Sequence, residues 1–443
     1  MSKFEAGPLS RRCFIGAAAA APAIVKAATS ERPALLGGTP VRTDPFPGWP
    51  VRGDVEDKAM LDVVHSGKWG RGVGRTVSVF ESKYANSIGA QHCLATSSGT
   101  SALFTALAAL GVGPGDEVIV PPYTFVACVN VILLHHAIPV FADTDPHTFQ
   151  VDAASLESKI TDRTAAIMPV HLGGSTFDVD AVLAIAAKRH LPVVEDTCQS
   201  HFAEWRGKRT GGFGKAGCFS FQASKNLNSG EGGALMTNDG AFMEQCYAFH
   251  NNGRSRTQPG SDFSYAERGM NVRMTEFQAA ILLSQLTRLE RQMEIREQNA
   301  KYLAGLLNEA GGLTPARTYA GCTRNAYHLF MMRYDAEQFG GLPRSKFIKA
   351  LSAEGVPASA GYSPLNKEPF LRNTFRNRGY QRIYGEKYIE QWFERNECPA
   401  NDRLCADAVW FTQTQLLGSR RDMDQIAEAV RKIKQHAGEL ARA

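Results

Sequence analysis

One lysine in a glycine-rich segment is the residue most suited to chemistry. Lys225 follows a short apolar run, Cys218–Phe221, and precedes three glycines within residues 230–233, so it is expected in a loop between two strands. A lysine amine set in a loop can serve as a nucleophile or a base once it loses its proton. An isolated lysine of this kind is more often an ordinary surface residue, so the neighbouring segments must decide.

Two further segments offer groups that bind charged ligands. Leu94–Ser101 leads from a short strand into a helix over 102–110, which leaves backbone donors and hydroxyls at a helix N-terminus, where phosphate binds well. Asp196 ends a buried strand and places a carboxylate at the strand end. Each feature also has a bland interpretation, since Ser/Thr-rich helix caps and strand-end aspartates are common. No Gly-x-x-x-x-Gly-Lys-Ser/Thr pattern is present, which argues against a P-loop nucleotide site.

Taken together, these segments resemble the DegT/StrS sugar aminotransferases, pyridoxal-phosphate (PLP) enzymes with the fold of aspartate aminotransferase. Lys225 stands where that family carries its Schiff-base lysine, and Asp196 stands where it carries the partner of the ring nitrogen. A carboxylate there keeps the nitrogen protonated, so that the ring can accept electrons. The resemblance assigns cofactor binding to Gly99, Thr100, Phe125, Asp196, Gln199, Ser220, Lys225 and Asn271.

Individual roles follow from the same resemblance. Gly99 and Thr100 are expected to contact the phosphate, and Phe125 to stack on the pyridine ring. On the isolated sequence, Phe125 would more often be a core aromatic. Gln199 follows the aspartate by three residues, as in the family, although the Thr-Cys between them is more often Ala-Ala there. Gln199 is expected beside the ring hydroxyl of the cofactor.

The segment Gly269–Glu276 bears on oligomeric state. It resembles the family's Gly-x-Asn-x-Arg-Met run, in which the asparagine reaches the phosphate of the neighbouring subunit's cofactor. Asn271 would therefore serve a partner's site, which implies a homodimer with shared active sites. Without the resemblance, Asn271 is a turn residue ahead of a helix cap at Thr275.

Strands and helices alternate through the first two thirds of the chain. Strands over 116–120, 139–142, 165–170 and 192–195 are separated by helices over 126–135 and 179–189, which predicts an α/β fold with a mostly parallel sheet. The resemblance specifies PLP-dependent transferase fold type I. We expect a large domain over 31–310, including an N-terminal arm, and a smaller α+β C-terminal domain over 311–443, because Gly311-Gly312 marks a change of composition.

Residues 1–30 have the layout of an export signal. Arg11-Arg12 precede Phe-Ile and a short Ala-rich run, which resembles a twin-arginine signal and predicts export of the folded protein. The alternative is a simple Ala-rich tail on a cytoplasmic enzyme.

Composition excludes several other classes. A formal net charge of +5 over 443 residues, without a dense basic run, argues against nucleic acid as a partner. No apolar run reaches the length of a membrane span. The nine cysteines lack metal-ligand spacing, so no metal site is expected, and the close pair Cys398 and Cys405 is expected to stay unpaired.

The resemblance also implies a reaction. The amino group of glutamate or glutamine would pass to a ketone on a polyhydroxylated ring, either a keto-cyclitol or a nucleotide-linked keto-sugar. Leu36–Arg42 and Gly355–Tyr362 are most similar to inosose aminotransferases and aminohydroxybenzoate synthases, which favours the cyclitol. Polar residues expected near the substrate are His171, His201 and Arg273.

Two alternatives remain at this level. A dehydratase of the same family carries histidine in place of the lysine, and Lys225 argues against it. A non-catalytic cofactor-binding or sensing protein would keep the same binding residues.

Overall fold

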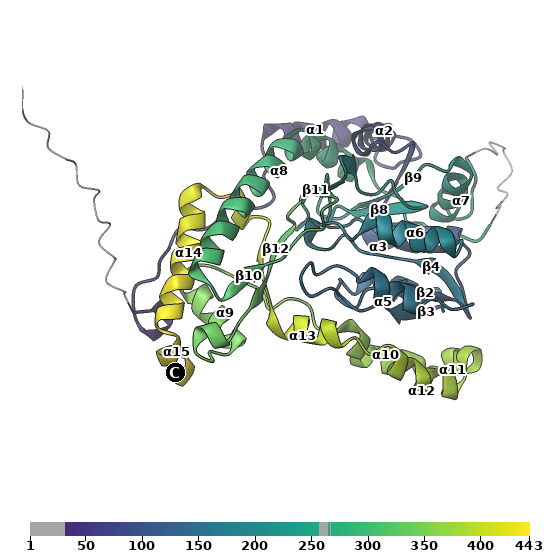
Figure 1. The fold of residues 1–443 in the computed structure, drawn as a ribbon. Helices are drawn as coiled ribbons and strands as arrows, with labels where there is room; N and C mark the ends of the chain where they lie inside the picture. Colours follow the sequence, from purple (N-terminus) through teal and green to yellow (C-terminus); the bar gives the residue numbers. More distant parts are fainter. Residues whose placement is uncertain (1–31, 257–264, 266) are drawn as a thin grey trace, which may run out of the picture.

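The computed structural model describes residues 32–256, 265 and 267–443 (Figure 1). The expected export signal, residues 1–30, lies outside the described residues. Within the described ranges, no helix has both the length and the apolar character that a bilayer crossing requires. All cysteines in these ranges are free thiols, Cys398 and Cys405 included.

A mostly parallel sheet forms the centre of the large domain. Its strands are β1 (His92–Thr96), β2 (Glu117–Val120), β3 (Ile138–Phe141), β4 (Thr164–Ile167), β5 (Val194–Asp196), β8 (Ala216–Ser220) and β9 (Gly233–Thr237). Hydrogen bonding gives the orders β3-β2-β4 and β5-β8-β9-β1, and the parallel bridges Ile167 to Val193 and Val170 to Asp196 join the two into one sheet. Only β9 runs antiparallel to its neighbours in this sheet. The predicted α/β architecture is therefore confirmed.

Helices cover both faces of this sheet, because its strands are apolar on both sides. Leu94 packs in one hydrophobic cluster with the residues of α3, whereas the next residue, Ala95, packs in another cluster with α2 and α8. The large-domain helices are α1 (Asp54–Ser66), α2 (Thr76–Ile88), α3 (Gly99–Ala109), α4 (Ala127–Leu134), α5 (Ala153–Ser158), α6 (Val179–Lys188) and α7 (Gly240–His250).

The long helix α8 (Glu276–Ala310) connects the large domain to the small one (Figure 1). It packs on α1 and α2 near its start and on α14 further along. The small domain contains the antiparallel sheet β10 (Leu313–Pro315), β12 (Leu329–Tyr334) and β13 (Ala408–Thr412), with α9 (Arg344–Ala353), α14 (Arg420–Gln435) and α15 (Ala437–Arg442). A minor sheet is formed by β6 (Glu204–Trp205), β7 (Lys208–Arg209) and β11 (Cys322–Arg324).

The N-terminal arm docks on the small domain, whereas the sequence placed it with the large one. The buried carboxylate of Glu354 accepts hydrogen bonds from the amides of Ala34 (2.8 Å) and Val41 (2.9 Å). Lys432 donates to the same carboxylate at 3.0 Å and neutralises it. Glu354 lies at the end of α9, far from the arm in the sequence. The sequence alone therefore could not reveal which domain the arm would join.

A helical segment over 369–407 crosses back to the large domain. It comprises α10 (Pro369–Phe375), α11 (Arg378–Tyr384), α12 (Glu386–Arg395) and α13 (Pro399–Asp407), and lies along the β2–β3 side of the large sheet (Figure 1). The buried Trp392 indole donates to the Pro139 carbonyl at 2.7 Å, and the Tyr380 hydroxyl donates to the Leu133 carbonyl at 2.9 Å. The sequence-based division at residue 311 thus assigns to the small domain a segment that packs on the large one.

Candidate active site

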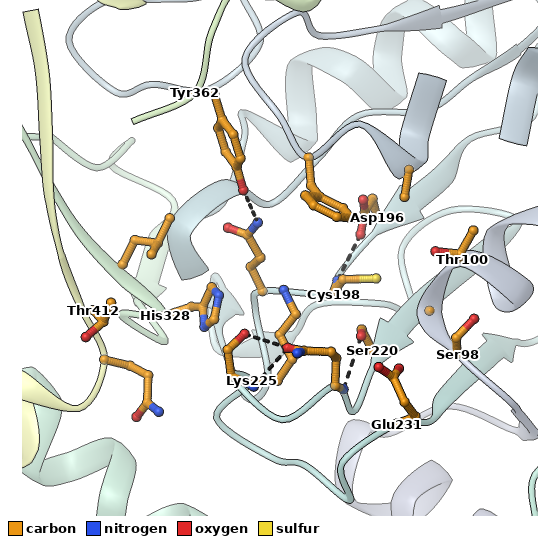
Figure 2. Close-up of a pocket in the computed structure, with 18 of the residues that line it drawn as sticks. Ser98, Thr100, Asp196, Cys198, Ser220, Lys225, Glu231, His328, Tyr362 and Thr412 are labelled. Carbon is orange, nitrogen blue, oxygen red and sulfur yellow. Dashed lines mark hydrogen bonds between the residues drawn. The ribbon is translucent and has the colours of Figure 1, made fainter. Parts of the chain in front are cut away.

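A cavity of about 770 Å³ opens where the carboxyl ends of the large-domain strands face the small domain. Its size suits a small-molecule site. One side, here called the strand-end wall, consists of Ser98, Gly99, Thr100, Asp196, Ser220 and Lys225. The opposite side, here called the small-domain wall, consists of Tyr362, Trp410, Thr412, Gln413 and Thr414. Figure 2 shows Lys225 between Thr412 on one side and Thr100 on the other.

Lys225 lies in the loop between β8 and β9, as the sequence predicts. Its backbone amide donates to the Gln222 carbonyl at 2.8 Å, and the side chain of the next residue, Asn226, donates to the Ala326 carbonyl at 2.7 Å. Hydrogen bonds therefore hold the loop both through its backbone and through a side chain. Burial lowers the pKa of the Lys225 amine from its ordinary value, although the nearby Asp196 carboxylate acts in the opposite direction. An amine with a lowered pKa is more readily available as a nucleophile or a base.

Asp196 is the last residue of β5 and lines the same cavity. One carboxylate oxygen accepts the Cys198 amide at 2.9 Å, and the other accepts the Cys128 thiol at 2.8 Å. Because both oxygens are held, the carboxylate keeps a fixed orientation.

The N-terminus of α3 forms the other end of the strand-end wall. The Ser98 hydroxyl caps the helix by accepting the Ser101 amide at 3.0 Å. The amides of Gly99 and Thr100 belong to the first turn and have no acceptor within the helix. A Cβ on Gly99 would lie 2.6 Å from the Cβ of Ser220, so glycine is needed for the helix to approach β8 this closely. These amides and the helix dipole form a site for an anion.

Three more residues named from the sequence line the cavity. Phe125 is 55% exposed although it is apolar, and its ring borders the cavity instead of packing in a core. Ser220 lines it at the end of β8, and Gln199 lines it beyond β5. The Gln199 side chain accepts the Gly173 amide at 2.8 Å and donates to the Tyr362 hydroxyl at 3.1 Å, which connects the large domain to the small-domain wall.

Two predicted substrate residues, His171 and His201, lie behind the cavity and are fully buried. His171 contacts the Glu195 carboxylate at 3.0 Å and stacks on Phe177. His201 donates to the Ser220 carbonyl at 2.9 Å, and burial lowers its pKa to about 3. Neither is among the cavity-lining residues in the described part of the chain, so their positions indicate supporting roles rather than substrate contacts.

Arg273 and Asn271 also lie outside this cavity. Arg273 donates to the Asn251 side chain at 3.0 Å. Asn271 is exposed to solvent, so its side chain is accessible to a second subunit.

The small-domain wall was not named as a site from the sequence. Its aromatic part is a cluster in which the Tyr362 and Trp410 rings lie 4.7 Å apart, and the Trp410 indole donates to the Tyr123 hydroxyl at 3.2 Å. Trp410 sits between two residues of β13, Val409 and Phe411, that face the small-domain core. Because side chains alternate along a strand, Trp410 must face away from the small-domain core. This alternation is the sequence signal that could have placed Trp410 in the cavity.

Comparison with known proteins settles the family. Residues 52–431 match the DegT/DnrJ/EryC1/StrS aminotransferase family. This chain belongs to that family.

Full-length relatives and solved structures agree with this aminotransferase assignment. An L-glutamine:2-deoxy-scyllo-inosose aminotransferase of Streptoalloteichus tenebrarius is 38% identical, covering 92% of this chain and 98% of the relative. A protein of the same name from Streptomyces kanamyceticus is 37% identical, covering 93% and 99%. The crystal structure of 3-amino-5-hydroxybenzoic acid synthase has a TM-score of 0.79 and 31% identity, covering 91% of this chain and 100% of that one. The expected family, aminotransferase class and fold type I are thereby confirmed.

Proposed function

We propose that this aminotransferase uses PLP to move the amino group of L-glutamine to a ketone on a polyhydroxylated ring. The observation that carries the proposal is a single cavity holding an amine with a lowered pKa, a fixed carboxylate and an open helix N-terminus. When bound, PLP supplies an aldehyde that takes up the amino group and a ring that withdraws electrons from the reacting carbon.

The strand-end wall fits this cofactor. The free amides of Gly99 and Thr100 would hold its phosphate, because they are anion donors without partners in the helix. The oriented Asp196 carboxylate would keep the ring nitrogen protonated, and the exposed ring of Phe125 offers a face for stacking. Ser220 and Gln199 would complete the group of residues that bind the cofactor.

Lys225 would move the protons. Its Nζ atom takes the proton from the α-carbon of the amino donor in the first half of the reaction. In the second half, Nζ delivers a proton to the acceptor carbon that gains the amino group. Burial supports both steps, because it keeps the amine closer to its neutral form.

The substrates are proposed from the relatives, which are named for L-glutamine and 2-deoxy-scyllo-inosose. The small-domain wall supports a hydroxyl-rich acceptor, since it offers the hydroxyls of Tyr362, Thr412 and Thr414. Simple keto acids should be poor acceptors, because they have no ring hydroxyls to pair with this wall.

A spectroscopic assay tests the function. Glutamine or glutamate should convert the purified enzyme to its amine form, and a keto-cyclitol such as scyllo-inosose should restore the aldehyde spectrum faster than a nucleotide-linked keto-hexose or pyruvate. Fastest recovery with pyruvate would refute a ring ketone, and preference for the nucleotide sugar would overturn the cyclitol alone. A non-catalytic binding protein would show no conversion with any amino acid.

We further propose a homodimer in which Asn271 reaches the partner's cofactor phosphate. The exposure of Asn271 supports this. Mixing an Asn271→Ala subunit with a Lys225→Ala subunit should restore activity, because each heterodimer then contains one intact site. Heterodimers that form and remain inactive would rule out sharing.

Export through the twin-arginine route is proposed from Arg11 and Arg12. Replacing both with lysine should keep a tagged protein in the cytoplasm. An unchanged location would show that the segment is not a working signal.

A further inference from the structure

A buried thiol contacts the carboxylate on the strand-end wall. Cys128 lies in the first turn of α4 and is 0% exposed. Its Sγ atom donates a hydrogen bond to Oδ2 of Asp196 at 2.8 Å. Because a fully buried side chain cannot contact a ligand in the cavity, Cys128 can influence the cofactor only through Asp196.

The surroundings keep this thiol in its donor form. Burial raises the pKa of Cys128 well above its ordinary value, and the negative charge of Asp196 raises it further. The sulfur therefore keeps its proton at the pH values at which enzymes work. A thiolate would repel the carboxylate, whereas the S–H group attracts it.

Thr124 extends the contact by one more hydrogen bond. It is buried, and its Oγ1 atom lies 3.6 Å from Sγ of Cys128. The single proton of the thiol is used toward Asp196, so the Thr124 hydroxyl must be the donor in this contact. The hydrogen bonds thus run in one direction, from Thr124 through Cys128 to Asp196.

The two hydrogen bonds to Asp196 hold it in different ways. The Cys198 amide, which donates at 2.9 Å, belongs to the same segment as Asp196 and would move with it (Figure 2). Cys128 follows β2, which β4 separates from β5 in the sheet. The thiol therefore fixes the carboxylate relative to a distant part of the chain.

That part of the chain also carries the aromatic ring at the cavity. Phe125 lies between Thr124 and Cys128 in the sequence, and its exposed ring borders the cavity while both neighbours are buried. A flat cofactor ring needs a stacking surface and a hydrogen-bond partner at a constant distance from each other. Each oxygen of Asp196 still has a second lone pair, which is available to a ring N–H group.

We propose that Cys128 is a positioning residue, whose thiol fixes Asp196 relative to Phe125 and thereby strengthens its bond to the cofactor's ring nitrogen. The inference rests on the proposed function, because it assumes that the cavity binds PLP. It adds to the site a residue that touches neither cofactor nor substrate.

Cofactor affinity tests this role independently of turnover. In Cys128→Ala the Kd for PLP, measured by fluorescence titration of the apoenzyme, should rise about three- to tenfold. In 1-deaza-PLP a C–H group replaces the ring nitrogen and offers Asp196 no proton. The Kd for this analogue should therefore change by less than about twofold. An equal loss for both cofactors would mean that the cavity left by the sulfur acts on the whole site, and would overturn the proposal.

Three further variants separate the hydrogen bond from packing. Cys128→Ser keeps a donor, so its Kd for PLP should stay within about twofold of the wild-type value. Thr124→Val removes only a hydroxyl and should weaken PLP binding by about two- to threefold, again without affecting the analogue, even if Cys128→Ala does not fold. Cys246→Ala removes a buried thiol of α7 from the same hydrophobic cluster and should change neither Kd. Equal losses in Cys128→Ser and Cys246→Ala would refute the positioning role.

An infrared measurement on the apoenzyme separates this inference from the proposed function. The S–H stretching band of Cys128 is obtained as the difference between the wild-type and Cys128→Ala spectra. It should move to higher frequency in Asp196→Asn, because an amide is a weaker acceptor than a carboxylate. If glutamine gives no amine form but this band moves and the PLP losses depend on the ring nitrogen, the reaction is wrong and the positioning role stands. If the band does not move, or Cys128→Ala keeps full affinity for PLP, the positioning role is wrong whatever the reaction.

Discussion

The two walls of the cavity differ in how their polar groups are satisfied. On the strand-end wall, the Asp196 carboxylate accepts two hydrogen bonds and the Ser98 hydroxyl caps α3. On the small-domain wall, the Thr412 and Thr414 hydroxyls hydrogen-bond to each other at an exposed position. A wall whose carboxylate is already oriented suits a cofactor that stays bound. Exposed hydroxyls suit substrates that enter and leave, because a hydroxyl can rotate to donate or to accept.

Lys225→Ala should have the largest effect. It removes both the amine that holds the cofactor and the proton carrier, so turnover should fall by about four powers of ten or more, since positioned proton transfer alone contributes up to about 10⁴-fold. Steady-state rates with glutamine and a keto-cyclitol measure this. Lys208→Ala, at an exposed position on the same domain, is the control. Substantial activity in Lys225→Ala would mean that the chemistry does not reside on the strand-end wall.

Asp196→Asn should have the second largest effect on activity. The amide keeps the shape but carries no charge, so it cannot stabilise a protonated ring nitrogen, and kcat should fall by about 10³-fold. Circular dichroism should show an intact fold. A loss below tenfold would identify some other group as the partner of the ring nitrogen.

Acid should destabilise the protein through buried histidines behind the strand-end wall. The pKa of His201 is about 3 when folded, while an exposed histidine titrates near 6.5. As the pH falls below 6.5, the unfolded chain takes up the proton first, so the free energy of unfolding decreases until about pH 3. From pH 6.5 to 5 the loss should be about 2 kcal/mol for this residue. Urea denaturation at both pH values measures it, and in His201→Gln the pH dependence should shrink by that amount.

Tyr362→Phe should give the smallest effect. It removes the hydroxyl that accepts the Gln199 amide across the two walls, which is worth about 1 kcal/mol, so the KM for the ketone should rise about fivefold with little change in kcat. Tyr302→Phe removes a hydroxyl on the exposed side of α8 and serves as the control. A large fall in kcat would show that Tyr362 takes part in the chemistry.

The strand-end wall could be predicted from the sequence because each of its residues ends a strand or lies in the segment that follows one. Asp196, Ser220 and Ser98 end or follow parallel strands, whose carboxyl ends meet at one edge of the sheet. The same rule failed for His171 and His201. Side chains alternate along extended backbone, and adjacent positions face opposite sides: Asp196 lines the cavity, whereas Glu195 contacts His171 behind it.

The small-domain wall could not be predicted, because its residues are far apart in the chain. Tyr362 follows α9, whereas Trp410 belongs to β13 and Gln413 to the turn after it. Apart from the alternation at Trp410, none has a local pattern that differs from ordinary packing. The backbone bridge between Ser359 and Trp410 brings the two segments together.

The helical segment over 369–407 has a consequence for how substrates are chosen. The chain leaves the small domain after α9, packs on the large domain through Tyr380 and Trp392, and returns to form β13 in the small domain. The large and small domains are therefore connected by this helical segment as well as by α8. A hinge between them would have to break this packing, so the cleft should keep nearly the same width throughout the catalytic cycle. Discrimination would then depend on the shape and charge of preformed surfaces, and not on a closing movement.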